Sequence, residues 1–303
     1  MLKRTRVFVV LFFLLSAAIF GGRRFYLSVH TDRIYPTINV PSESATVSVK
    51  GGDEAILEGV TAEDNKDGDL TDQLFIESRS GFDKDKKFIV NIAVSDSANH
   101  ITKATREVSY SDYTAPQFEL SGPLVFQKAA NSQDDVNIVA YLTAHDVLDG
   151  DVSNKIRISG DYTMNVYQEG DYPMEFIVSN SMGDTSTLPV TVKLCNPAVE
   201  SSLPQIRLKQ YLINTPVGSG VNLDDMIEDI AYRGSVFNKS EDGNYYCGEY
   251  TTNGEAIMIP SSFIKRTGTV DFETPGVYEI TYTYEDAETE IQNYSRLYVV
   301  VAE

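Results

Sequence analysis

The chain has 303 residues, of which 42% are hydrophobic and 23% charged, so it is long enough for two or three domains and too apolar to be disordered. Its formal net charge is −19, and the first 24 residues hold five basic side chains and no acid. The remainder therefore carries 20 basic and 44 acidic residues. A body this acidic would repel phosphate backbones, which excludes nucleic acid as a partner, and the acid is expected to keep an exposed protein soluble.

The N-terminal segment, residues 1–26, is expected to be a signal-anchor or a signal peptide. Three basic residues precede an apolar run, and residues 7–22 are the part expected in the membrane. The run is short for a permanent span, but a basic pair follows it and its end lacks a small-x-small cleavage site. We expect a retained anchor, with a cleaved signal peptide as the alternative. In either case the basic flank places residues 27–303 outside the cytoplasm.

A ten-residue motif occurs twice, at residues 62–71 and 144–153, with the shared pattern A-x-D-x-x-D-G-D-(apolar)-(Thr/Ser). Each copy lies between two apolar stretches, and its glycine, Gly68 or Gly150, tolerates the positive φ that a tight turn needs. We therefore expect a chain reversal between two strands at each copy.

Other landmarks occur three times along the chain. Alternating apolar residues predict strands with one buried face at 88–94, 172–178 and 278–284, followed by Asp96, Asn180 and Asp286. A second strand is expected after each, at 101–109, 185–194 and 291–301. Each unit opens with a proline before an apolar strand, at Pro36, Pro116 and Pro204.

These repeats predict an all-β chain of three tandem immunoglobulin-like β-sandwich domains after an N-terminal hydrophobic helix. The expected domains are 34–111, 112–195 and 203–303, and the third carries an insertion at 231–262.

The D-x-x-D-G-D-(L/V)-(T/S) loop and the later Gly-x-Tyr strand ending in Asp or Asn resemble bacterial Ig-like domains that occur in tandem on surface proteins and are related to hyalin-repeat modules. The resemblance covers residues 34–195. The third unit keeps the opening and closing landmarks but lacks the loop. The resemblance implies a sandwich fold and a surface setting, and it implies no common activity.

No catalytic motif is present in the sequence, and the three histidines share no spacing that would form one. We therefore expect a protein that is not an enzyme, with an envelope enzyme of unrecognised site as an alternative.

The acidic loops suggest calcium as a ligand, because residues 63–68 resemble the first half of a calcium-binding loop. The twelfth position of that loop would be Leu74, which cannot bind the ion. We expect the carboxylates to bond backbone N–H groups instead, and so expect no cofactor. The calcium alternative would use Asp64, Asp67, Asp69, Asp146, Asp149 and Asp151.

The third unit holds the candidate binding loop. Asn222 followed by apolar residues at helical spacing predicts one short helix over 222–230. The polar insertion then presents Tyr245, Tyr246 and Tyr250, which suit contact with a protein or a glycan, while an extra hairpin covering the core is the alternative.

Two cysteines, Cys195 and Cys247, could form a disulfide between the second and third units in an oxidising exterior. Two independent thiols are the alternative interpretation.

The sequence as a whole favours a bacterial, membrane-tethered extracellular stalk or adhesion protein at the cell membrane, or a secreted form if the N-terminus is cleaved. An accessory protein that binds carbohydrate or cell wall through the third domain is the second hypothesis. An unknown surface protein or glycan is the expected partner in both.

Overall fold

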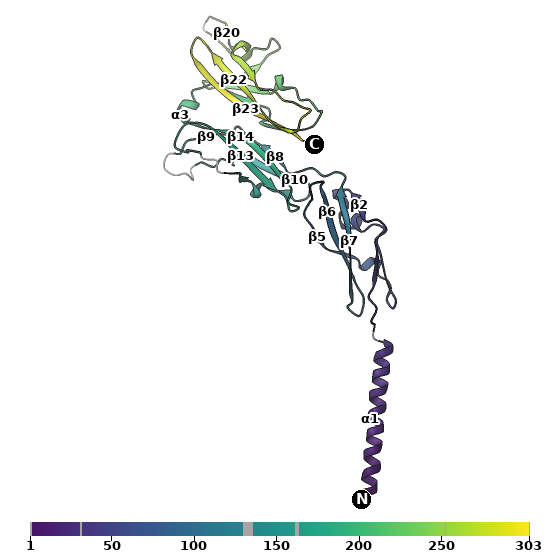
Figure 1. Ribbon diagram of the computed structural model, residues 1–303. Coiled ribbons are helices and arrows are strands. Elements are labelled where there is room, and N and C mark those ends of the chain that lie inside the picture. Colours follow the sequence, from purple (N-terminus) through teal and green to yellow (C-terminus); the bar gives the residue numbers. More distant parts are fainter. Residues whose placement is uncertain (1, 31, 130–135, 161–163, 252, 303) are drawn as a thin grey trace. The chain divides into compact units, whose positions relative to one another are not determined.

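The computed structural model describes residues 2–30, 32–129, 136–160, 164–251 and 253–302 (Figure 1). It divides into two compact units, Met1–Tyr113 and Thr114–Glu303. The first unit holds an N-terminal helix and one β-sandwich, domain 1. The second unit holds two β-sandwiches, domains 2 and 3. The predicted fold class is confirmed.

Helix α1 (Leu2–His30) is longer than the apolar run at its centre. Its segment Thr5–Tyr26 has 22 residues and a mean hydropathy of 2.0, and every side chain in that segment is exposed. At 1.5 Å per residue such a segment is about 33 Å long, enough for a hydrocarbon core of about 30 Å. The helix could therefore be a membrane anchor, and a signal sequence would show the same features.

Domain 1 packs two sheets face to face. One is formed by β1 (Thr37–Asn39), β3 (Thr61–Asp64) and β4 (Gly68–Asp69). The other has the order β2 (Ser44–Val47), β7 (Ile101–Tyr110), β6 (Lys87–Ser95) and β5 (Phe75–Arg79). Short helical turns lie at η1 (Val49–Gly51), α2 (Gly52–Leu57) and η2 (Thr71–Gln73).

Domain 2 repeats this plan. Its small sheet has the order β11 (Gly150–Asp151), β10 (Leu142–Asp146) and β8 (Gln117–Leu120). Its larger sheet has the order β12 (Arg157–Ile158), β13 (Gly170–Ser179), β14 (Thr185–Cys195) and β9 (Val125–Gln127). A 3₁₀ turn, η4 (Ser153–Lys155), follows the loop, and α3 (Pro197–Glu200) leads to domain 3.

Domain 3 keeps one sheet of the plan and enlarges the other. The first has the order β16 (Leu212–Pro216), β23 (Ile291–Ala302), β22 (Gly276–Asp286) and β21 (Ile264–Thr267). The second has the order β15 (Gln205–Leu208), β17 (Ile227–Tyr232), β18 (Ser235–Lys239), β19 (Tyr245–Tyr250) and β20 (Ala256–Ile259). Two 3₁₀ turns, η5 (Leu223–Asp225) and η6 (Ser261–Phe263), join its strands.

The three sandwiches share their connectivity. In each one the last two strands form a long antiparallel hairpin, β6–β7, β13–β14 or β22–β23. The final strand also pairs in parallel with the second strand of its domain, as β2–β7, β9–β14 and β16–β23. The predicted alternation is confirmed in these hairpins, where Phe88, Phe176 and Ile280 are at most 2% exposed.

The predicted helix over 222–230 is wrong. Asn222 does cap a turn, because its side chain accepts a hydrogen bond from the backbone N–H of Asp224, but that turn is the 3₁₀ element η5. Strand β17 follows, with Ile227 opposite Leu208 and Asp229 opposite Arg207. Glu228 is therefore an extra residue in β17, a β-bulge. The bulge places Ile227 and Ile230 on the buried side although they are three residues apart, which imitates helical spacing in the sequence.

Candidate functional site

The two D-G-D loops form the same turn in domains 1 and 2. The Oδ1 atom of Asp64 accepts hydrogen bonds from the backbone N–H groups of Lys66 at 2.8 Å and Asp67 at 3.0 Å. Asp146 does the same for Leu148 and Asp149, at 2.9 Å each. These are the backbone bonds predicted for the loops. Hydrogen bonds from the turn lower the pKa of Asp64 below its ordinary value, so this carboxylate is ionised at neutral pH.

Two further features of each turn follow the prediction. Gly68 and Gly150 have φ values of 72° and 73°, a conformation that glycine adopts without steric cost. The hydroxyls of Thr71 and Ser153 accept hydrogen bonds from the backbone N–H groups of Ala62 and Ala144.

The middle aspartate of each loop ties the turn to the neighbouring hairpin. Asp67 accepts hydrogen bonds from the backbone N–H and hydroxyl of Ser97, both at 2.8 Å. Asp149 accepts the same pair of bonds from Ser181, at 2.8 and 2.6 Å. The loop thereby links the two sheets of its sandwich, a connection between distant segments that the local motif does not reveal.

The loop of domain 2 provides the first testable prediction. Asp146 is 1% exposed, and its side chain bonds Leu148, Asp149 and Asn180. Asp146→Ala is expected to cost about 2 kcal/mol, because these donors are left without an acceptor. The loss, measured by thermal unfolding, should be equal with calcium or with a chelator. Glu119→Ala, at an exposed position of β8, should change the melting temperature little. A loss that appeared only with calcium present would contradict this structural role.

The candidate tyrosine loop of domain 3 is not a loop. Strands β19 and β20 pair and extend the sheet beyond β18, so the insertion at 231–262 forms the extra strands of the alternative interpretation. Tyr245 is 3% exposed and packs in the domain core, which removes it from the candidate contact surface. The hydroxyl of Tyr246 donates to Asp242 at 2.8 Å. Tyr250 is 70% exposed and is the one of the three that faces solvent fully.

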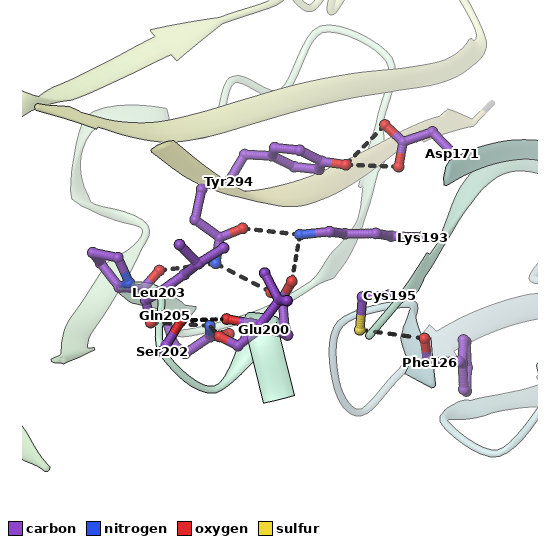
Figure 2. Close-up of polar contacts among 12 residues, drawn as sticks. Phe126, Asp171, Lys193, Cys195, Glu200, Ser202, Leu203, Gln205 and Tyr294 are labelled. Carbon is purple, nitrogen blue, oxygen red and sulfur yellow. Dashed lines mark hydrogen bonds and ion pairs between the residues drawn. The ribbon is translucent and has the colours of Figure 1, made fainter. Parts of the chain in front are cut away.

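The two cysteines are not bonded to each other. The thiol of Cys195 donates to the carbonyl oxygen of Phe126 at 3.4 Å (Figure 2), and that of Cys247 lies 3.7 Å from the carbonyl oxygen of Ile257. Each cysteine therefore contacts its own domain, and the structure does not form the bridge considered from the sequence. Burial raises the pKa of the Cys195 thiol, which keeps it protonated and unreactive at neutral pH.

A thiol count tests this arrangement. Protein denatured without reductant should react with two equivalents of a thiol reagent per chain. Under native conditions Cys195 should react much more slowly than Cys247, because Cys195 is buried and Cys247 is half-buried. A count near zero in the denatured protein would contradict the structure.

An extended polar site joins domain 2 to domain 3, and it was not predicted from the sequence. Both carboxylate oxygens of Asp171 on β13 accept from the hydroxyl of Tyr294 on β23, at 2.6 and 2.8 Å (Figure 2). Arg296 on the same strand donates to Asp171 at 2.6 Å and to Glu279 at 3.1 Å. The side chain of Arg296 is 15% exposed. Two acids therefore share one largely buried cation.

The ring of Tyr294 is in contact with two cations. The Arg296 guanidinium carbon is 4.5 Å from the ring centroid and the Lys193 ammonium is 4.6 Å from it. Such contacts between a cation and a ring face are attractive and stronger when partly desolvated. Lys193 belongs to β14 of domain 2, so the ring of Tyr294 contacts side chains of both domains.

Lys193 also connects domain 2 to the segment between the domains. Its ammonium forms an ion pair with Glu200 of α3 at 2.8 Å and donates to Asn293 of β23 at 2.9 Å. Figure 2 shows Lys193 and Glu200 facing each other at this junction. Asn293 in turn donates to Glu200 and to the carbonyl oxygen of Pro204. Strand β14, the linker and strand β23 are therefore held in one hydrogen-bonded network.

An apolar seam lies beside these polar contacts. Leu212 and Tyr298 of domain 3 belong to the buried cluster that forms the core of domain 2, and Val277 and Val300 pack against it. The Tyr298 hydroxyl accepts from the backbone N–H of Thr191 at 2.9 Å and donates to its carbonyl oxygen at 3.2 Å. The two sandwiches therefore share a core as well as polar contacts, unlike domains joined by a flexible linker.

Acid should weaken this junction. Burial acts to raise the pKa of Asp171, but hydrogen bonds from Arg296 and Tyr294 outweigh it and hold the pKa below its ordinary value of 3.8. A carboxyl with a depressed folded pKa stabilises the fold above its unfolded pKa, and that stabilisation is lost as pH falls through the folded pKa. Asp171→Asn should therefore lower the melting temperature of the second unit at pH 7. The difference from wild type should shrink below about pH 4. A difference that did not change with pH would contradict this account.

The comparisons with known proteins agree with a sandwich fold. Residues 239–292, within domain 3, match the family model described as Bacterial Ig-like domain (group 3). This is the domain that lacks the D-G-D loop, where the resemblance seen in the sequence was weakest. A comparison with curated proteins finds no match.

Solved structures resemble the chain at low sequence identity and low TM-score. A ZmpB structure from Clostridium perfringens, with a catalytic domain and two CBM51 domains, has 13% identity and a TM-score of 0.20, covering 88% of this chain and 31% of that chain. The lipoprotein BT2262 from Bacteroides thetaiotaomicron has 12% identity and a TM-score of 0.22, covering 60% and 98%. Human CDH23 EC21-23 has 13% identity and a TM-score of 0.21, covering 88% and 100%. The chain consists of tandem β-sandwich domains after an N-terminal apolar helix, and its third domain matches a bacterial Ig-like family.

Proposed function

We propose that the protein is a non-catalytic, membrane-tethered stalk or adhesion module of a bacterium, anchored by α1 and carrying its β-sandwiches outside the cytoplasm. The observation that carries this proposal is the junction between domains 2 and 3. A protein that holds a surface at a distance from the membrane needs domains that do not rotate freely about their linker. The buried Arg296, the Tyr298 contacts and the shared apolar cluster meet that need.

The length of the helix supports the tether. The 22-residue apolar segment of α1 can cross a bilayer, and the basic residues on both sides of its apolar centre would lie in the headgroup regions. The acidic remainder suits a body that stays in solution instead of lying on an anionic lipid surface.

The accessory hypothesis, binding of glycan through domain 3, has less support. It relied on three clustered tyrosines, of which Tyr245 is in the core and Tyr246 is bonded to Asp242. Tyr250 alone gives one exposed ring at the end of β19, whereas sugar recognition by stacking generally uses a pocket or a platform of several groups.

Fractionation of cells that produce the full chain tests the tether. The full-length mass should stay in the membrane pellet, and protease added to wall-stripped intact cells should degrade residues 27–303 while a cytoplasmic marker survives. A matched chain that lacks residues 1–26 should appear in the soluble fraction. Soluble wild-type protein that begins near residues 19–27 would contradict the tether and indicate a cleaved signal peptide.

A further inference from the structure

Three aspartates from separate segments of domain 1 meet at one point. Asp32 precedes β1, Asp64 ends β3, and Asp96 follows β6. One carboxylate oxygen from each lies within 4.8 Å of the other two. Asp64 and Asp96 are 4% and 5% exposed, and Asp32 is half-buried. Three carboxylates at this separation repel one another strongly where water is excluded, so the arrangement needs a positive charge.

One oxygen of this cluster is buried without a partner. Oδ1 of Asp64 accepts the two backbone bonds of its turn, while its Oδ2 has no hydrogen-bond partner among the residues that the structure describes. A buried polar atom left unpaired costs about 1–3 kcal/mol, and more when it is charged. The carboxylate of Asp64 is directed into the cluster, so a ligand bound there would satisfy it.

The other two carboxylates are held in place by their own segments. Asp32 accepts from the backbone N–H of Ile34 at 3.0 Å. Asp96 accepts from the backbone N–H of His100, and its second oxygen lies 2.7 Å from Nδ1 of the same residue. The ring of His100 packs against that of Tyr35 at a tilt of 32°, with centroids 4.6 Å apart. Outer contacts of this kind orient carboxylate ligands before an ion arrives.

In domain 2 the oxygen that corresponds to Oδ2 of Asp64 has a hydrogen-bond donor, so it needs no ion. The aspartate that corresponds to Asp64 is Asp146, and the residue that corresponds to Asp96 is Asn180. The amide of Asn180 donates to Oδ2 of Asp146 at 3.1 Å. In domain 1 the amide donor is replaced by a second carboxylate. The carboxylate of Asp96 cannot donate the hydrogen bond that the neutral amide of Asn180 donates in domain 2. The cluster in domain 1 can therefore accept a cation in its place.

We propose that Asp32, Asp64 and Asp96 bind a calcium ion. Calcium takes six to eight oxygen ligands in flexible geometry, and three carboxylates completed by water fit that preference better than they fit zinc, which favours nitrogen and sulfur. The ion joins the segment entering domain 1 to both sheets of the sandwich. Among the six aspartates considered from the sequence only Asp64 takes part, and the contribution of Asp32, far from the motif, could not be read from its spacing.

Calorimetric titration of the full chain in detergent with calcium chloride, after treatment with a chelator, tests the site. Wild type should bind about one calcium ion per chain, and the melting transition of domain 1 should rise by about 5 °C or more at saturation. Asp96→Asn copies the domain 2 arrangement. It should fold, lose the calcium response, and in chelator melt at or above the wild-type temperature. Asp32→Asn, at a half-buried position, should weaken binding at least about tenfold, since one of three charged ligands is lost.

Asp72→Asn, at an exposed position of the same domain outside the cluster, should bind calcium as wild type does. The proposal is overturned if wild type shows neither binding heat nor a shift in melting at millimolar calcium. It is also overturned if Asp96→Asn responds to calcium as wild type does. These results are independent of the membrane tether, because the titration needs only the folded chain.

Discussion

Arg296→Ala is expected to destabilise the second unit by about 3 kcal/mol and to separate the unfolding of domains 2 and 3 into two transitions. The Arg296 side chain is 15% exposed and neutralises both Asp171 and Glu279. Its removal leaves two acids facing each other without a cation, and breaking a buried ion pair from one side costs about 3–5 kcal/mol. We expect a cost at the lower end of this range, because the side chains of Asp171 and Glu279 are 39% and 35% exposed and so are partly solvated.

Lys265→Ala is the matched control, because Lys265 pairs with Glu285 within domain 3 and both side chains are well exposed. It should cost at most about 1 kcal/mol. Urea unfolding gives the free energies of unfolding. Limited proteolysis in the linker around α3 reports whether the junction has opened, and cleavage there should increase in Arg296→Ala alone. Equal effects of the two substitutions would show that the ion pair at the junction contributes no more than a surface pair.

Gly268→Ala should destabilise domain 3 by about 3 kcal/mol. Gly268 directly follows β21 and has a φ of 94°, which side chains other than glycine rarely adopt. An added Cβ would overlap the carbonyl oxygen of Glu279 and would lie 3.1 Å from Cδ1 of Ile280. The obstacle is the backbone of the central strand β22, which can shift only if its pairing with β23 is disturbed.

Comparison with Gly254→Ala separates the cost of backbone strain from the cost of steric overlap. Gly254 has a φ of 81°, and an added Cβ would meet nothing within 4 Å among the described residues. Its expected cost is about 1 kcal/mol, from backbone conformation alone. Thermal unfolding of the two variants should therefore differ by about 2 kcal/mol. If Gly268→Ala lowered the free energy of unfolding as little as Gly254→Ala does, the backbone of β22 would have to shift at little cost, which would contradict this prediction.

The sequence predicts well those features that depend on neighbouring residues. Alternation along β6, β13 and β22 is local, and so are the turn glycines and the aspartates that bond the next backbone N–H groups. The extra residue Glu228 shows how a local rule fails, because one bulge turns the spacing of a strand into that of a helix. Tyr245 shows a second failure, since a polar, glycine-rich stretch still forms a strand once the edge of β18 offers it a partner.

The polar junction and the aspartate cluster are both assembled from distant segments. Asp171 and Arg296 are 125 residues apart, and no periodicity relates them. The same holds for Asp32, Asp64 and Asp96, which meet only because the sandwich folds their segments together. The sequence does show that Asp96 of domain 1 corresponds to Asn180 of domain 2. This difference can be interpreted only from the structure, in which Asn180 donates a hydrogen bond to Asp146.

The parallel pairing of the second and last strands has a mechanical consequence. In β16–β23, Leu212 to Pro216 lie beside Tyr298 to Ala302 in the same direction, so the start of one strand and the end of the other are at opposite ends of the pair. A force that pulls on both ends of the domain then slides the two strands along each other, and all their hydrogen bonds share the load at once. Antiparallel strands pulled from one end would open bond by bond at much lower force. Each sandwich repeats this geometry, so we expect each to resist tension along the chain by shear of these two strands.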